Sequence, residues 1–267
     1  MLTKDTAICI RAVDYSETSQ IVTFFARATG KISAIAKGSK RPKSAFDGPI
    51  EIFSYGKIVF SDSNKEKLAT LTEFAQHQLG VSSTQKARRF DAGQLVRGTG
   101  LSNNLFTMNC CLFSTELLNK FTHDYDPHPQ LFDDFLQFLQ NAQENKNKHQ
   151  MLALLILFQL GLLKEVGLQP ILNYCVNCKT RYEHRVSSIE HRVYFSSSAN
   201  GLICRDCEAS FPDKVRLTQT AANCLSNLKL LAKSQEKTLI EIETVLVGHF
   251  TELLGRKPKM AKYILTL

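Results

Sequence analysis

The chain has 267 residues, of which 43% are hydrophobic, so it can bury a sizeable core and form two domains with a small insertion. Its first residues lack the basic and apolar segments of a secretory signal, and its longest apolar run, 151–163, is too short to cross a bilayer. We therefore expect a cytoplasmic protein with reduced thiols and no membrane role. The net charge of +8 is moderate but unevenly distributed.

Residues 1–80 contain short β-branched and aromatic runs that alternate with polar turns, and no convincing helix interrupts them. The five runs are Thr6–Val13, Gln20–Arg27, Lys31–Lys37, Ile50–Phe60 and Leu68–Phe74. Short strands in this number and spacing predict a small closed barrel, and the OB-fold is the natural candidate.

A basic stretch between Ala28 and Phe46 holds five cations and no acidic residue. The cations are Lys31, Lys37, Lys40, Arg41 and Lys43. Clustered positive charge attracts a phosphate backbone and releases its counterions. Charge alone favours DNA binding here only slightly over a solvated loop.

Aromatic rings near this stretch are candidates for stacking on bases, as in other OB-folds that bind single strands. They are Phe24, Phe25, Phe46, Phe53, Tyr55 and Phe60. Because successive strand residues point to opposite faces, at least one of Phe24 and Phe25 is expected in the core.

Residues 81–267 change to a helical period, with apolar stripes at 105–118, 131–139 and 152–163. Two further amphipathic helices are expected at Leu217–Leu231 and Leu239–Leu254. The histidines and aspartates of 123–128 crowd into one proline-punctuated turn, which favours an interhelical loop over a metallohydrolase site. Exposed arginines near the stripes are candidates for docking an acidic, apolar-ended tail: Arg88, Arg89 and Arg97.

Two Cys-x-x-Cys pairs, Cys175 with Cys178 and Cys204 with Cys207, interrupt this helical region. Four thiolates in two tight turns suit one tetrahedral Zn²⁺ and leave no position for water, so we expect a structural zinc module over residues 171–212. A thioredoxin-like redox site would need a single pair between a strand and a helix. His184 and His191 are alternative ligands, and Val186–Ile189 and Arg192–Phe195 are expected hairpin strands.

Three segments together carry a family resemblance: the basic loop Gly30–Ser44, the helix opening Pro129–Leu136, and Gly167–Pro170 followed by the cysteine pairs and Phe195-Ser196. On these segments the chain resembles the RecO family of recombination and DNA-repair proteins over nearly its whole length. One departure lies near the C-terminus, where Lys-Ser is expected and Lys257-Pro258 is found.

The resemblance implies a recombination mediator without enzymatic turnover, cytoplasmic and associated with the nucleoid. Such proteins bind single- and double-stranded DNA, anneal complementary strands, contact the acidic C-terminal tail of single-strand-binding protein, and act with RecR to help load RecA. The chain has no phosphate-binding loop of the Gly-x-x-x-x-Gly-Lys-Ser/Thr kind, so any ATP dependence is expected to come from partners. Two other classes stay open: a thiol oxidoreductase or zinc hydrolase, and a zinc-stabilised adaptor that uses its barrel only for protein contacts. If the basic loop is only a solvated turn, the DNA path is expected over the arginines of the zinc insert: Arg181, Arg185, Arg192 and Arg205.

Overall fold

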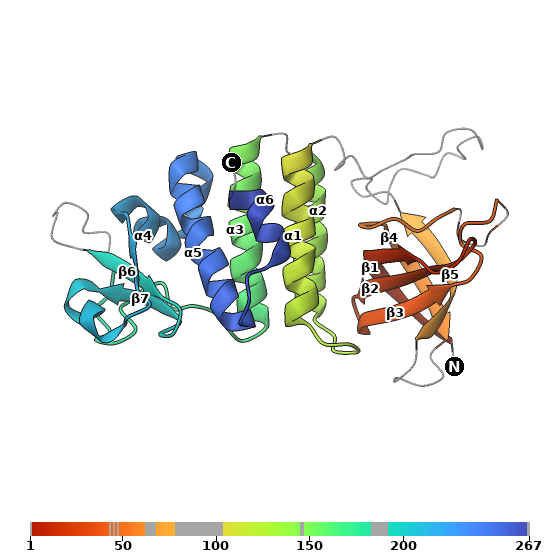
Figure 1. Cartoon of the computed structure of the whole chain (residues 1–267), viewed down its shortest axis with the longest axis horizontal. Coiled ribbons are helices and arrows are strands. Elements are labelled where there is room, and N and C mark those ends of the chain that lie inside the picture. The colour runs from red at the N-terminus through yellow and green to blue at the C-terminus, as the bar shows by residue number, and fades with distance from the viewer. Residues whose placement is uncertain are drawn as a thin grey trace. The chain divides into compact units, whose positions relative to one another are not determined.

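The computed structural model describes residues 2–42, 44, 46, 48–61, 68–77, 104–144, 147–182 and 192–265 (Figure 1). The chain forms two compact units. We call Met1–Asn103 with Thr122–Glu144 the barrel unit, and Asn104–Phe121 with Asn145–Leu267 the helical unit. The expected domain boundary after residue 80 lies outside the described residues and stays a prediction. Within the described ranges, no helix combines the length and apolar character needed to span a membrane.

Five strands of the barrel unit close into a barrel with the order β1-β2-β3-β5-β4. They are β1 (Leu2–Asp14), β2 (Gln20–Ala26), β3 (Gly30–Ala36), β4 (Tyr55–Ser61) and β5 (Ala69–His77). All neighbours pair antiparallel except β3 and β5, whose parallel pairing closes the barrel. The predicted five-stranded OB-fold is confirmed.

The pleat of β2 sends its two adjacent phenylalanines to opposite faces. Phe24 lies inside the barrel, where its ring is 5.4 Å from that of Phe74. Phe25 points outward but is also fully buried, because its ring packs 6.1 Å from Phe132 of helix α2 (Pro129–Glu144). Both faces of this strand are therefore core.

The segment that precedes α2 is joined to the turn between β2 and β3. Arg27 donates to both carboxylate oxygens of Asp133, at 2.9 and 2.8 Å. Tyr125 N donates to Lys31 O at 2.9 Å. Gly30 is required at this contact, because a Cβ there would lie 2.3 Å from the backbone oxygen of Asp126. Residues 122–144 thus belong to the barrel unit.

Three long helices form the centre of the helical unit: α1 (Leu105–Phe121), α3 (Lys148–Glu165) and α5 (Glu236–Leu254). Most residues of their apolar stripes are buried, as predicted, although Leu105 at the start of α1 is exposed. The expected helix 217–231 is shorter: α4 (Gln219–Ser226) ends at Asn227, whose side chain caps the 3₁₀ helix η3 (Leu228–Lys233). The chain ends in η4 (Lys259–Ala261) and α6 (Lys262–Leu265).

A small three-stranded sheet with the order β7-β6-β8 lies between α3 and α4 in the sequence. Its strands are β6 (Val193–Ser196), β7 (Gly201–Cys204) and β8 (Val215–Leu217), and the 3₁₀ helix η2 (Arg205–Ser210) follows β7. The strand predicted at 192–195 is confirmed, whereas the one predicted at 186–189 lies outside the described residues. β8 pairs with β6, so the sheet extends past residue 212.

Candidate metal centre and nucleic-acid interface

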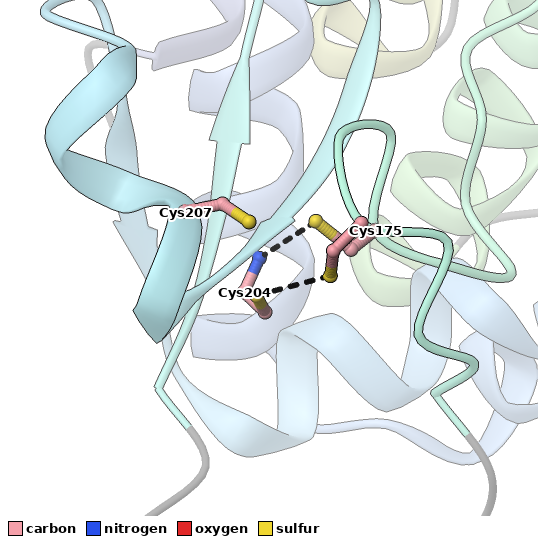
Figure 2. A group of neighbouring side chains, drawn as sticks. Cys175, Cys204 and Cys207 are labelled. Atoms are coloured by element: carbon pink, nitrogen blue, oxygen red, sulfur yellow. Dashed lines mark hydrogen bonds between the residues drawn. The ribbon is translucent and has the colours of Figure 1, made fainter.

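The four cysteines of the two pairs converge on one point of the helical unit. Their Sγ atoms all lie within 4.8 Å of one another. Figure 2 shows Cys204 and Cys207 facing Cys175 across the gap between β7 and the first cysteine loop. Cys175 and Cys207 are buried, whereas Cys178 is exposed. Among the described residues, this is the one group of three or more histidine, cysteine, aspartate or glutamate side chains placed so that they could hold a metal ion.

Backbone pairing along β7 brings the two cysteine pairs together. Leu202 N donates to Ile171 O at 2.9 Å, and Val176 N donates to Leu202 O at 2.9 Å. Gly201 permits this close approach, because a Cβ at that position would lie 2.4 Å from Ile171 O. The first cysteine loop is thereby held against the strand that carries Cys204.

Hydrogen-bond donors surround the sulfur atoms. Cys204 N donates to Cys175 Sγ at 3.4 Å, and Asn177 Nδ2 donates to Cys207 Sγ at 3.3 Å. Hydrogen bonds from Thr180 lower the pKa of the Cys178 thiol to about 6. Donors of this kind stabilise thiolates and orient them as ligands.

Burial has the opposite effect on one member of the cluster, since it raises the pKa of the Cys204 thiol to about 12. Four thiolates this close together repel one another unless a cation lies between them. The donor set therefore fits a soft divalent cation, and four sulfur ligands would complete a tetrahedral shell. His184 and His191, the alternative ligands, lie outside the described residues.

The predicted DNA-binding cations occupy different environments in the barrel unit. Lys31 Nζ donates to Thr122 O at 2.9 Å and lies 3.4 Å from Asp124 Oδ1, and only 12% of the Lys31 side chain is exposed. Lys31 therefore helps to hold the 122–128 segment on the barrel. Lys43 lies outside the described residues.

The other three cations lie at the end of β3 and in the turn that follows. Lys37 and Arg41 are exposed, and Lys40 forms a 2.7 Å ion pair with Asp14. Lys40 N also donates to Thr18 O at 3.1 Å, so this turn lies beside the β1–β2 turn. Surface ion pairs are weak and are exchanged readily for a phosphate contact.

A buried glutamine fixes the loop that carries these cations. Gln20 Oε1 accepts from Ser39 Oγ at 3.0 Å and from Ile50 N at 2.9 Å, and its Nε2 donates to Ile50 O at 3.2 Å. Both ends of the β3–β4 loop are therefore anchored to one side chain. Sequence reasoning missed this residue, because a lone glutamine in a strand carries no signal.

The outer face of β1, β2 and β3 continues from the basic turn. Strand register aligns Val13 with Ile21 and Ile21 with Ile35, which forms a partly exposed apolar row. Tyr15, in the β1–β2 turn, is 64% exposed. This face joins apolar surface, one accessible ring and the exposed cations Lys37 and Arg41.

Most of the rings predicted to stack on bases are unavailable. Five of the six are buried: Phe24, Phe25, Phe46, Phe53 and Phe60. The stacking prediction was wrong for these five, whereas the expectation that at least one of Phe24 and Phe25 lies in the core is confirmed. Large rings such as Phe46 and Phe60 fill the interior of the small barrel, and α2 covers Phe25. Tyr55 is half-buried beside His77, and Tyr15 was not predicted.

Two further candidate surfaces are only partly described. Arg88, Arg89, Arg97 and Arg185 lie outside the described residues. Arg181, Arg192 and Arg205 of the cysteine module are exposed. In the 123–128 turn, His128 Nε2 lies 3.3 Å from Asp126 Oδ2, and Asp124 contacts Lys31, so these polar groups hold the turn in place.

Comparison with known proteins assigns the family. Residues 1–78 match the family model "Recombination protein O N terminal", and residues 102–262 match "Recombination protein O C terminal". Proteins named DNA repair protein RecO from Bacillus pumilus and Halalkalibacterium halodurans are each 28% identical over 99% of this chain and 94% of their own length. One from Rhodopirellula baltica is 29% identical over 86% of this chain and 75% of its own. With a five-stranded OB barrel and a four-cysteine cluster in these same regions, the chain belongs to the RecO family of DNA repair and recombination proteins.

Proposed function

We propose that this chain is a non-enzymatic recombination mediator that binds single- and double-stranded DNA and anneals complementary strands. Its membership of a DNA repair and recombination family supports this, and so does the exposed basic turn on an OB barrel. The observation that carries the proposal is the junction of Lys37 and Arg41 with the accessible outer face of β1–β3. OB-folds commonly bind oligonucleotides on this face and its flanking loops.

In this proposal the phosphates lie along Lys37, Lys40 and Arg41, and Lys43, which lies outside the described residues, is a further candidate contact. Lys40 exchanges Asp14 for phosphate. Bases lie over the Val13–Ile21–Ile35 row and stack on Tyr15, which provides contact without reading sequence. Lys31 takes part indirectly, by holding the 122–128 segment.

The cysteine cluster, in the same proposal, holds one Zn²⁺ and has a structural role. Cys175, Cys178, Cys204 and Cys207 would complete its coordination, and the ion would supply charge that lets the four thiolates coexist. A closed sulfur shell leaves no place for a substrate, which argues against a zinc hydrolase.

Protein partners complete the proposal. As the family resemblance implies, the chain acts with RecR, contacts the acidic tail of single-strand-binding protein, and promotes RecA loading indirectly. The apolar row on the barrel favours one alternative use of this face, namely contact with a protein. In a titration with purified RecR, loss of RecR binding by Val13→Thr/Ile35→Thr with unchanged DNA affinity would assign the row to that contact.

The salt dependence of oligonucleotide binding tests the DNA track. In Lys37→Ala/Arg41→Ala the slope of log K against log salt for a single strand should fall by about 1.4, because each phosphate contact contributes about 0.7. Affinity should fall alike for all base sequences. The matched control Lys229→Ala/Lys237→Ala removes two exposed cations from the helical unit and should keep the parent slope. An unchanged slope in the first variant would reject this track.

A further inference from the structure

The C-terminal segment of the helical unit is strongly cationic. Residues 253–265 contain four cations and no acidic residue. Arg256, Lys257, Lys259 and Lys262 are all exposed. A charged run is often only a solvated surface, so the packing around this one decides whether its cations can meet a ligand.

Packing fixes the backbone of this segment and directs its cations outward. Pro258, Ala261 and Ile264 are buried. The two carboxylate oxygens of Glu116 on α1 accept from Lys259 N and Met260 N, each at 2.8 Å. Because Glu116 binds backbone groups, it anchors the segment through its main chain.

The side chains of Arg256, Lys257 and Lys259 remain available to a ligand. In the described part of the chain, Arg256, Lys257 and Lys259 form no ion pair. Two apolar groups are accessible beside them, with Leu253 37% and Tyr263 46% exposed. Lys262 Nζ lies 4.7 Å from the centre of the Tyr263 ring. Cations and an accessible ring thus occur together.

We propose that the segment 253–263 is a second nucleic-acid contact, on the helical unit and separate from the track on the barrel. Closely spaced cations match the repeated charges of a phosphate backbone, and an exposed tyrosine offers a stacking surface for an unpaired base. This inference rests on the proposed function: a protein that anneals strands must hold two at once, and two sites on one chain allow this.

A triple variant of the full-length protein, Arg256→Ala/Lys257→Ala/Lys259→Ala, tests the site. The annealing rate of two complementary oligonucleotides should fall by roughly 10-fold or more. At saturating oligonucleotide, the number of strands bound per chain should fall from two to one, whereas the tighter site on the barrel keeps its affinity. The matched control Lys229→Ala/Lys233→Ala/Lys237→Ala removes three other exposed cations and should anneal at the parent rate. Equal metal content and melting temperature establish that both variants fold.

A pair of tyrosine variants separates stacking from charge. Tyr263→Ala should weaken single-strand binding at this site by roughly 10-fold, and Tyr263→Phe, which keeps the ring, should restore it. Parent annealing and two strands bound by the triple variant would overturn the inference. The inference would also be overturned if the triple variant lost affinity for a synthetic acidic peptide while its DNA binding stayed unchanged, since the segment would then be a peptide-binding site. If the parent protein binds no DNA, the proposed function fails. If Lys37→Ala/Arg41→Ala loses DNA binding but the triple variant keeps the parent's DNA binding and annealing, this inference alone fails.

Discussion

The OB barrel and the cysteine module hold themselves together in different ways. Among its described residues, the barrel encloses fifteen buried apolar side chains, including Phe24, Phe60 and Phe74. In the described part of the module, the core around the cysteines has four buried members, and two of them are Cys175 and Cys207 themselves. Apolar burial contributes stability in proportion to area, so the barrel is expected to fold on its own core and the module only with its metal. Two parts of one chain can therefore depend on different forces.

Loss of one metal ligand should have the largest effect. Cys204→Ser leaves three thiolates, and metal binding contributes on the order of 10–16 kcal/mol of apparent folding free energy to small zinc modules. We expect elemental analysis to find no stoichiometric zinc and thermal unfolding to show an early transition for the module. Cys224→Ser is the matched control, because Cys224 is buried but outside the cluster. A Cys204→Ser protein that melts like the parent would remove the proposed dependence on metal.

A cavity in the barrel should destabilise the barrel and leave the metal content of the cysteine module unchanged. Phe24→Ala removes a fully buried ring that packs on Phe74, and such deletions cost about 3–5 kcal/mol. Denaturant unfolding should show this loss in the barrel, while zinc content stays at the parent level. Zinc loss from Phe24→Ala would show that the two regions are not independent.

A buried carboxyl should make the helical unit sensitive to pH. Burial raises the pKa of Glu243 from its usual 4.5 to about 7, although Gln159 Nε2 donates to it at 2.8 Å. The folded state therefore holds the proton more tightly than the unfolded state, and stability present below pH 4.5 is lost as pH rises toward 7. The total loss is about 3 kcal/mol.

Glu243→Gln should abolish this dependence, because the amide cannot ionise. Unfolding free energies at pH 5 and pH 8 should then differ less than in the parent, with the gain at pH 8. Burial raises the pKa of the Cys110 thiol on α1 well above its usual 9.0, so this thiol is neutral at both pH values, and Cys110→Ala serves as a control that should keep the parent's pH dependence. An equal pH dependence in parent and Glu243→Gln would mean that this carboxyl is already ionised in the fold.

The smallest expected effect belongs to the buried amide of the barrel. The side-chain oxygen and nitrogen of Gln20 both have hydrogen-bond partners, namely Ser39 and Ile50. Gln20→Ala leaves those groups unpaired, which costs about 1–3 kcal/mol. Hydrogen exchange should accelerate at Ile50 N, and DNA affinity should fall because the basic turn loses its anchor. Unchanged DNA affinity in Gln20→Ala would show that DNA binding does not depend on how well this loop is anchored.

Local patterns in the sequence predicted the elements that depend on local chemistry. Alternating apolar runs predicted the barrel, and cysteine spacing predicted a cluster whose sulfurs do converge. Long-range contacts could not be predicted in the same way. The burial of Phe25 depends on Phe132, and the engagement of Lys31 depends on Thr122 and Asp124, which are far away in the sequence. Charge and aromaticity mark candidates, but only tertiary packing decides which remain accessible.

Hydrogen exchange before and after metal chelation, under reducing conditions, tests the central contrast most directly. We expect one zinc ion to leave per chain and the amides at 171–176 and 201–207 to lose their protection. Amides of β1, β2 and β3 should keep theirs. Release of no metal, with the same protection in both regions, would show that the module does not depend on metal. A barrel that loses protection together with the module would show that the two regions do not depend on different forces.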